Sequence, residues 1–161
     1  MKRVLIITYY WPPTGGSGVQ RWVKFAKYLP EEGWQPVIYT PENPEQLAVD
    51  TSLESEIPSE AEVIKTHITE PYELYKKFLK KSGHSKEAVE VNPVNAQNKS
   101  FLQKAAMWIR GNFFRPDPRC LWIGPSVRFL KKYLKEHPVD LIVSTGPPQS
   151  MHMIGRKLAL E

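Results

Sequence analysis

The chain has 161 residues, of which 41% are hydrophobic and 24% are charged, and its formal net charge at pH 7 is +5. These proportions are typical of a soluble globular domain, and no apolar run approaches the ~20 residues needed to cross a bilayer. The only cysteine, Cys120, has no partner for an internal disulfide, and the four histidines lack the spacing of a zinc site. We therefore expect one domain in the reducing cytoplasm, without a metal and with an anionic partner.

The first predicted unit is a strand, a glycine-rich loop and a helix. The strand contains Val4–Ile7, four aliphatic residues without polar alternation, as in a strand that is buried on both faces of a parallel sheet. The helix carries one apolar stripe at helical spacing, formed by Val19, Trp22, Val23, Ala26 and Leu29. We expect this helix to end near Pro30 and Gly33.

The loop between this strand and this helix contains Gly15, Gly16, Ser17 and Gly18. Glycines let an anion approach the backbone closely, and a helix N-terminus presents unpaired amides and the positive end of the helix dipole. The preceding segment, Tyr9–Pro13, is longer and more aromatic than a simple connection requires. The loop is therefore predicted to bind a phosphate, although a tight turn alone would use the same glycines.

The rest of the chain continues the alternation of strands and helices. Further strands are predicted at 35–40, 61–67 and 139–144, and helices at 45–49, 72–81, 101–109, 126–136 and from about 151 onward. The polar stretch 82–100 is predicted to be a mobile insertion. This order predicts an α/β fold, a Rossmann-like and mostly parallel sheet with helices on both faces.

A strand order of 3-2-1-4 would make the first and fourth strands neighbours. The loops 12–18 and 145–152 each follow one of these two strands, and both are rich in glycine and proline. Open α/β sheets bind their ligands beyond the carboxyl ends of the strands, where the order reverses. We therefore expect the two loops to face each other across one crevice.

Two segments resemble a family of known enzymes. Val4–Pro13, followed by Gly15–Gly18, resembles the opening of retaining group-1 (family 4) glycosyltransferases, whose N-terminal domains commonly begin with a strand, a YPP-like or FPP-like segment and a glycine loop. Asp140–Pro148 is similar to a strand end of bacterial members that build surface polysaccharides. The resemblance implies that residues 1–161 are the N-terminal, acceptor-side half of a GT-B fold, and that the donor-binding C-terminal domain is absent. The chain also stops inside a predicted helix, as expected for a fragment that is inactive alone.

The resemblance implies a transferase that moves a sugar from a nucleotide-diphosphate sugar to a glycan or lipid-linked acceptor, without a cofactor or a metal. Gly15, Gly16 and Gly18, with Ser17 between them, match the backbone that approaches the donor's diphosphate and sugar. His152 is the nearest match to a histidine that contacts the transferred sugar and is the catalytic candidate, although an ordinary histidine at a helix start would look the same. The other residues expected to line the cleft are Tyr10, Trp11, Gln20, Arg21, Gly146, Pro147, Gln149 and Ser150.

Two other functions stay open at this point. A dinucleotide-binding domain of an oxidoreductase would use the G-x-G at residues 16–18, but Arg21 stands at the third glycine position and Glu42 is a poor ribose ligand. A non-enzymatic module that binds a membrane surface would use the helix 72–81. Its four lysines alternate with aromatic residues, although they could equally cover a core stripe: Lys76, Lys77, Lys80 and Lys81. We expect a cytoplasmic protein with peripheral contact at the inner face of the plasma membrane and no nucleic-acid partner.

Overall fold

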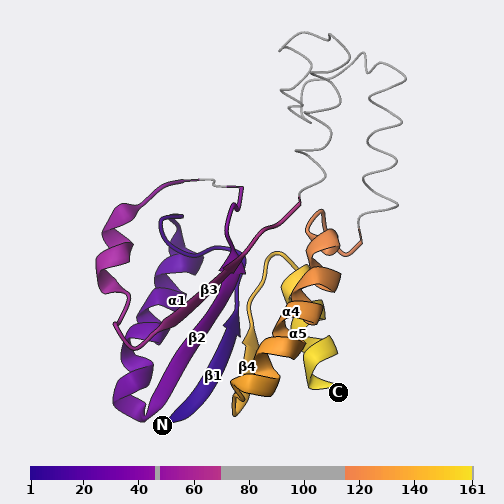
Figure 1. Ribbon diagram of the computed structural model, residues 1–161. Coiled ribbons are helices and arrows are strands. Elements are labelled where there is room, and N and C mark those ends of the chain that lie inside the picture. Colours follow the sequence, from indigo (N-terminus) through magenta and orange to yellow (C-terminus); the bar gives the residue numbers. More distant parts are fainter. Residues whose placement is uncertain (46–47, 70–114, 161) are drawn as a thin grey trace, which may run out of the picture. The chain divides into compact units, whose positions relative to one another are not determined.

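The computed structural model describes residues 1–45, 48–69 and 115–160, which include a four-stranded sheet (Figure 1). Its strands are β1 (Lys2–Ile7), β2 (Trp34–Pro41), β3 (Glu62–Thr66) and β4 (Leu141–Ser144). They lie in the order β3-β2-β1-β4, and every neighbouring pair is parallel. The predicted α/β class and strand order are confirmed.

The chain forms two compact units. One contains Met1–Ile68 together with Trp122–Glu161, and the other contains Thr69–Leu121. The sheet and the helices discussed below belong to the first unit. The predicted helices 72–81 and 101–109 and the predicted insertion 82–100 lie outside the described residues.

Helices cover both faces of the sheet, as predicted (Figure 1). On one face lies α1 (Ser17–Tyr28), followed by the 3-10 helix η1 (Leu29–Glu32). On the other face lie α4 (Ile123–Glu136) and α5 (Ser150–Ala159). Two short 3-10 helices complete the described elements, η2 (Thr51–Glu56) and η4 (Cys120–Trp122).

The core explains why the strand sequences lack polar alternation. Successive residues of a strand point to opposite faces of the sheet. Ile38 of β2 therefore packs under α1, with Val4, Ile6, Val19, Val23 and Ala26, all buried. Its neighbour Tyr39 points to the opposite face, where its ring stacks on Trp122 with a centroid distance of 5.0 Å. Because both faces are covered, both sets of side chains must be apolar.

One predicted helix and the start of another were wrong, each for a local reason. The helix predicted at 45–49 is not formed at Val49, which pairs with Thr14 in an isolated antiparallel bridge. A 3-10 helix follows instead, and the Asp50 side chain caps it by accepting a hydrogen bond from the Ser52 amide. The helix predicted from 126 begins three residues earlier, at Ile123. Pro125 lies in its first turn. A backbone amide at this position has no hydrogen-bond acceptor within the helix, so the proline costs the helix no hydrogen bond.

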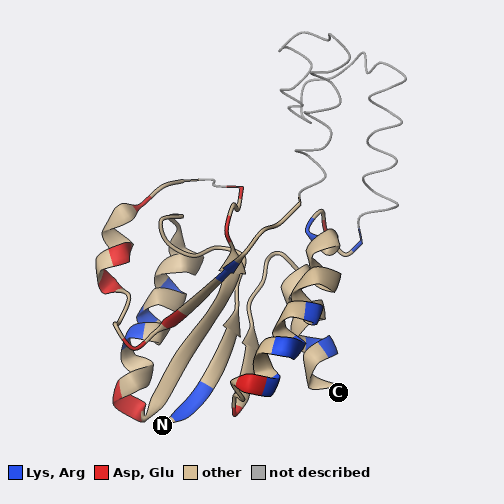
Figure 2. Ribbon diagram, viewed as in Figure 1, with Lys and Arg blue, Asp and Glu red and all other residues tan. Residues whose placement is uncertain are grey.

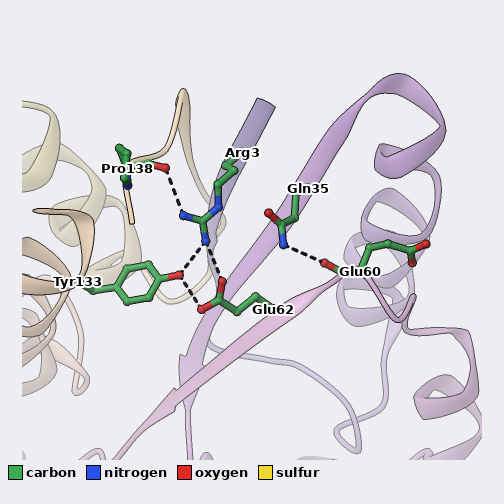
Figure 3. A network of polar contacts seen from close by, with 6 residues as sticks. All are labelled: Arg3, Gln35, Glu60, Glu62, Tyr133 and Pro138. Atoms are coloured by element: carbon green, nitrogen blue, oxygen red, sulfur yellow. Dashed lines mark hydrogen bonds and ion pairs between the residues drawn. The ribbon is translucent and has the colours of Figure 1, made fainter. Parts of the chain in front are cut away.

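A network of polar contacts connects the amino ends of β1 and β3 with α4 (Figure 3). The Arg3 guanidinium donates to a Glu62 carboxylate oxygen at 2.8 Å and to the Tyr133 hydroxyl at 2.9 Å. That hydroxyl donates to the other Glu62 oxygen at 2.6 Å. Burial and the adjacent Glu62 carboxylate raise the pKa of Tyr133. The network joins β1, β3 and α4 at the end of the sheet opposite the loops that follow β1 and β4.

Candidate functional site

The site is built at the carboxyl ends of β1 and β4. These strands are direct neighbours, with Ile7 paired to Ser144, so the loops that follow them leave the same edge side by side. The Thr145 amide donates to the Ile7 carbonyl at 3.0 Å, which extends the pairing by one residue. The first loop leads to α1 on one face of the sheet, and the second leads to α5 on the other. This is the point at which open α/β sheets form a ligand crevice.

A side-chain hydrogen bond ties the second loop to the first helix. Trp22 of α1 donates from Nε1 to the Thr145 hydroxyl oxygen at 2.7 Å. Trp22 is half-buried, and its ring packs against Phe25 at a centroid distance of 5.4 Å. Arg21 lies with its guanidinium carbon 6.0 Å from the Trp22 ring centroid, and its side chain is exposed. A cation therefore lies beside the indole that contacts the loop after β4.

The other helix is tied to β4 by the residue before Thr145. Ser144 Oγ lies 2.9 Å from Nδ1 of His152, which sits in the first turn of α5. The His152 ring also lies against Gly146, because a Cβ built there would be only 2.7 Å from its Nε2. His152 is exposed, whereas Ser150 and Met151 beside it are buried. The histidine is thus exposed, and its ring contacts the end of β4 and the loop that follows it.

The glycine loop divides into a fixed part and an open part. The Gly15 amide donates to the Ala48 carbonyl at 2.9 Å, and a Cβ at Gly15 would meet the Asp50 Cβ at 3.0 Å. Gly15 therefore packs against residues 48–50, and its amide already has a hydrogen-bond partner. Gly16 has a φ of 128°, a conformation that favours glycine, and it forms the N-cap of α1.

The exposed part of the loop is the start of α1. Ser17 and Gly18 are the first two helical residues, both exposed, and no side chain caps the helix. Within the described residues, their backbone amides donate no hydrogen bond. An anion could therefore accept hydrogen bonds from these amides at the positive end of the helix dipole.

The aromatic segment before the loop has a mainly structural role. Tyr9 and Trp11 are 1% and 3% exposed, and Trp11 packs in the core beside α1. Trp11 also lines a small pocket at the ends of β2 and β3, together with Pro12, Pro13, Thr40, Pro41, Glu42, Pro44 and Lys65. Tyr10 is half-buried, and its ring meets that of Tyr9 edge to face at 4.7 Å. Trp11 is predicted to line the cleft, but its indole lies mainly in the core.

The remaining predicted residues surround the same two helix starts. Gln20 is exposed, one turn into α1. Gln149 is the exposed N-cap of α5, and its carbonyl accepts hydrogen bonds from the amides of His152 and Met153. Pro147 is exposed and Gly146 is half-buried in the second loop. The structure thus places Gln20 and Arg21 on α1, over one face of the sheet, and His152 on α5, over the other.

Sequence reasoning missed three residues that organise this site. Helical spacing places Trp22 in the apolar stripe, which fits its position at the edge of the buried face, but spacing alone does not show that its indole nitrogen donates a hydrogen bond. Ser144 and Thr145 are two hydroxyl residues at the end of a buried strand, with side chains on opposite faces. Two consecutive hydroxyl residues at a strand end could have indicated that each hydroxyl contacts a helix on a different face of the sheet.

The arrangement suits a ligand rich in oxygen atoms. The segments that follow β1 and β4 carry exposed backbone amides, a cation, an imidazole and hydroxyl groups. Within the described residues, no group of three or more histidine, cysteine, aspartate or glutamate side chains could hold a metal ion. Over the same residues, no helix is both long enough and apolar enough to span a membrane.

Compared with protein-family models, curated protein sequences and solved structures, the chain shows no significant match to any of them.

Proposed function

We propose that this chain is the N-terminal, acceptor-side domain of a glycosyltransferase that moves a sugar from a nucleotide-diphosphate sugar to a glycan or lipid-linked acceptor. The observation that carries the proposal is the hydrogen bond that joins α1 to the loop after β4. Trp22 Nε1 donates to the Thr145 hydroxyl at 2.7 Å, and His152, 2.9 Å from Ser144, follows the same loop at the start of α5. The resemblance of both loop sequences to family-4 glycosyltransferases supports the same assignment.

Each part of the crevice answers a need of this reaction. Negative charge grows on the nucleoside diphosphate as it leaves, and the amides of Ser17 and Gly18, with the helix dipole behind them, would stabilise it. His152 would contact the sugar from the opposite side of the crevice. Arg21 adds positive charge close to the amides. With such groups neutralising the diphosphate, the reaction requires no metal.

We further propose that the protein works in the cytoplasm at the inner face of the plasma membrane, in the synthesis of a surface polysaccharide. Arg128, Lys132 and Lys135 recur at i, i+4 and i+7 along α4, opposite its buried stripe. None of the three forms an ion pair within the described residues, whereas Lys24 and Lys27 of α1 are both paired with Glu56. Blue segments accordingly mark α4 and α5 in Figure 2, and red segments gather around η1 and η2. An unpaired basic surface supports contact with anionic lipid.

The proposal is tested by titrating the ¹⁵N-labelled chain with UDP-glucose, GDP-mannose, inorganic diphosphate and NADH while amide resonances are followed. We expect the nucleotide sugars and diphosphate to shift the Ser17, Gly18 and His152 resonances together, with a Kd on the order of 1 mM. Gly33, at the opposite end of the sheet, serves as the control resonance. Tight binding of NADH alone would contradict the transferase assignment and favour a dinucleotide site.

A further inference from the structure

The imidazole of His152 is held from two directions. On one side its Nδ1 lies 2.9 Å from Ser144 Oγ. On the other its Nε2 edge rests against Gly146, where a Cβ would approach Nε2 to 2.7 Å and Cδ2 to 3.3 Å. Any residue other than glycine at this position would push the ring away. A half-turn of the ring would also replace Nδ1 by a carbon atom opposite the Ser144 hydroxyl, so this contact fixes one ring orientation.

The Ser144 hydroxyl makes its hydrogen bond with His152 beneath helix α5. Helix α5 closes over it at Gly155, where a Cβ would lie 3.3 Å from both Cβ and Oγ of Ser144. Gly155 is buried, and Ser144 is half-buried. Within the described residues, Nδ1 of His152 is the only hydrogen-bond partner of Ser144 Oγ.

This arrangement selects among the protonation states of the ring. A hydroxyl group has one hydrogen to donate, and in a neutral imidazole one nitrogen carries the proton and the other accepts. If Nε2 carries the proton, the Ser144 hydroxyl donates to Nδ1 and both groups are satisfied. If Nδ1 carries it, the hydroxyl accepts, and its own hydrogen has no acceptor among the described residues, which is the less favourable arrangement. In the charged imidazolium both nitrogens carry protons.

We propose that Ser144 is the positioning residue of His152, holding the ring with a proton on Nε2 so that the site offers one fixed hydrogen-bond donor to an oxygen atom of the ligand. Nε2 carries this proton in the neutral and in the charged ring alike, and it makes no hydrogen bond to the described residues. His152 therefore binds a hydroxyl or phosphate oxygen through Nε2 and does not act there as a base or a metal ligand. The nature of the ligand rests on the proposed function, whereas the state of the ring does not.

The first test needs no ligand. Long-range ¹H–¹⁵N correlation on the ¹⁵N-histidine-labelled chain, at a pH about two units above the ordinary histidine pKa of ~6.5, shows which nitrogen carries the proton. His67 and His137 are exposed and serve as references in the same spectrum. We expect the Nδ1-protonated fraction to be several-fold lower for His152 than for these two histidines. Equal fractions in the unmodified chain would overturn the proposal without any variant.

Variants then assign the effect to Ser144. In Ser144→Ala the Nδ1-protonated fraction of His152 should rise to that of His67 and His137, while Ser59→Ala, a change at an exposed serine, should leave it unchanged. Gly146→Ala displaces the ring by sterics and should produce the same rise with the hydroxyl intact. If His152 keeps its proton distribution in Ser144→Ala, Ser144 does not position the ring. Should that variant fail to fold, Gly146→Ala and the reference histidines still decide the question.

The second test uses ligands, with UDP and UDP-glucose as probes. Ser144→Ala should weaken UDP-glucose binding several-fold, and it should add no further loss when combined with His152→Ala, because Ser144 acts through the ring. An equal loss for UDP would assign the contact to a phosphate oxygen, and a loss confined to UDP-glucose would assign it to a sugar hydroxyl. Additive losses in the double variant would overturn the positioning role. Failure of both probes to bind the unmodified chain would contradict the proposed function, while the ring measurement would still stand.

Discussion

The indole Nε1 of Trp22 donates a 2.7 Å hydrogen bond to the hydroxyl of Thr145, although the two residues are 123 positions apart in the sequence. This bond joins the first helix to the loop that follows the fourth strand. The loop after β1 and the loop after β4 therefore keep a defined spacing at the edge where the ligand is proposed to bind.

A double-mutant cycle measures this link. Trp22→Phe and Thr145→Val should each destabilise the chain, and the two changes together should cost about 1 kcal/mol less than the sum, because the hydrogen bond is lost only once. The free energy of unfolding in urea is the measurement. A control cycle with Phe25→Leu in place of Trp22→Phe should show additivity. Additivity in the Trp22 cycle as well would mean that the bond contributes nothing to stability.

The glycines of the first loop should differ sharply in their tolerance of a methyl group. Gly15→Ala brings a Cβ to 3.0 Å from the Asp50 Cβ, so we expect a loss of about 1–3 kcal/mol. Gly18→Ala meets no atom within 4 Å in a helical position, so we expect a gain of up to ~1 kcal/mol. Thermal or urea unfolding of the two matched variants checks this. Equal losses would show that the segment 48–50 does not pack against Gly15.

The free energy of unfolding should fall in alkaline solution as the hydroxyl groups of Tyr39 and Tyr133 lose their protons. Burial raises the pKa of Tyr39, and burial together with Glu62 raises that of Tyr133. The unfolded state therefore loses these protons first, so the stabilisation is complete below the ordinary tyrosine pKa of ~10 and is lost as the pH rises through the raised values. Tyr133→Phe should make the decline of the unfolding free energy above pH ~10 shallower. Tyr28→Phe, at an exposed tyrosine, is the control and should not change the slope.

Vesicle binding should depend on the basic stripe of α4. Arg128→Glu combined with Lys132→Glu should lower the partitioning onto vesicles that contain anionic lipid by about tenfold or more, since each basic residue near such a surface contributes about 1 kcal/mol. Lys2→Glu combined with Lys65→Glu makes the same change in net charge outside α4 and should have a smaller effect. Sedimentation with vesicles at low and high salt provides the measurement. Equal losses in both pairs would indicate a response to net charge alone, and unchanged binding in the α4 pair would exclude this stripe.

The α/β class and the layering could be predicted because they depend on local patterns. The aliphatic run at Val4–Ile7 and the stripe from Val19 to Leu29 each report burial through the period of the sequence. The position of the crevice followed from the order of strands and helices by a general rule for such sheets. The burial pattern needs no knowledge of contacts between distant residues, whereas the strand order depends on pairings such as that of Val4 with Leu141.

The detailed site could not be predicted, because its contacts join residues far apart in the chain. Gly15 was expected to contact a ligand, but its amide is bound to Ala48 and its Cα packs beside Asp50. The indole of Trp22 has a partner that only the folded sheet brings near. Trp11 reads as a cleft residue because it follows the strand, yet it turns into the core beside α1.

Ser144 and Thr145 are consecutive, and their side chains hold helices on opposite faces of the sheet. Inserting one residue before this pair, inside β4, would exchange the two faces and break both contacts at once. Length variation among natural relatives should therefore be absent between residues 141 and 145. The pair Ser144 and Thr145 thus fixes the positions of α1 and α5 relative to the end of β4.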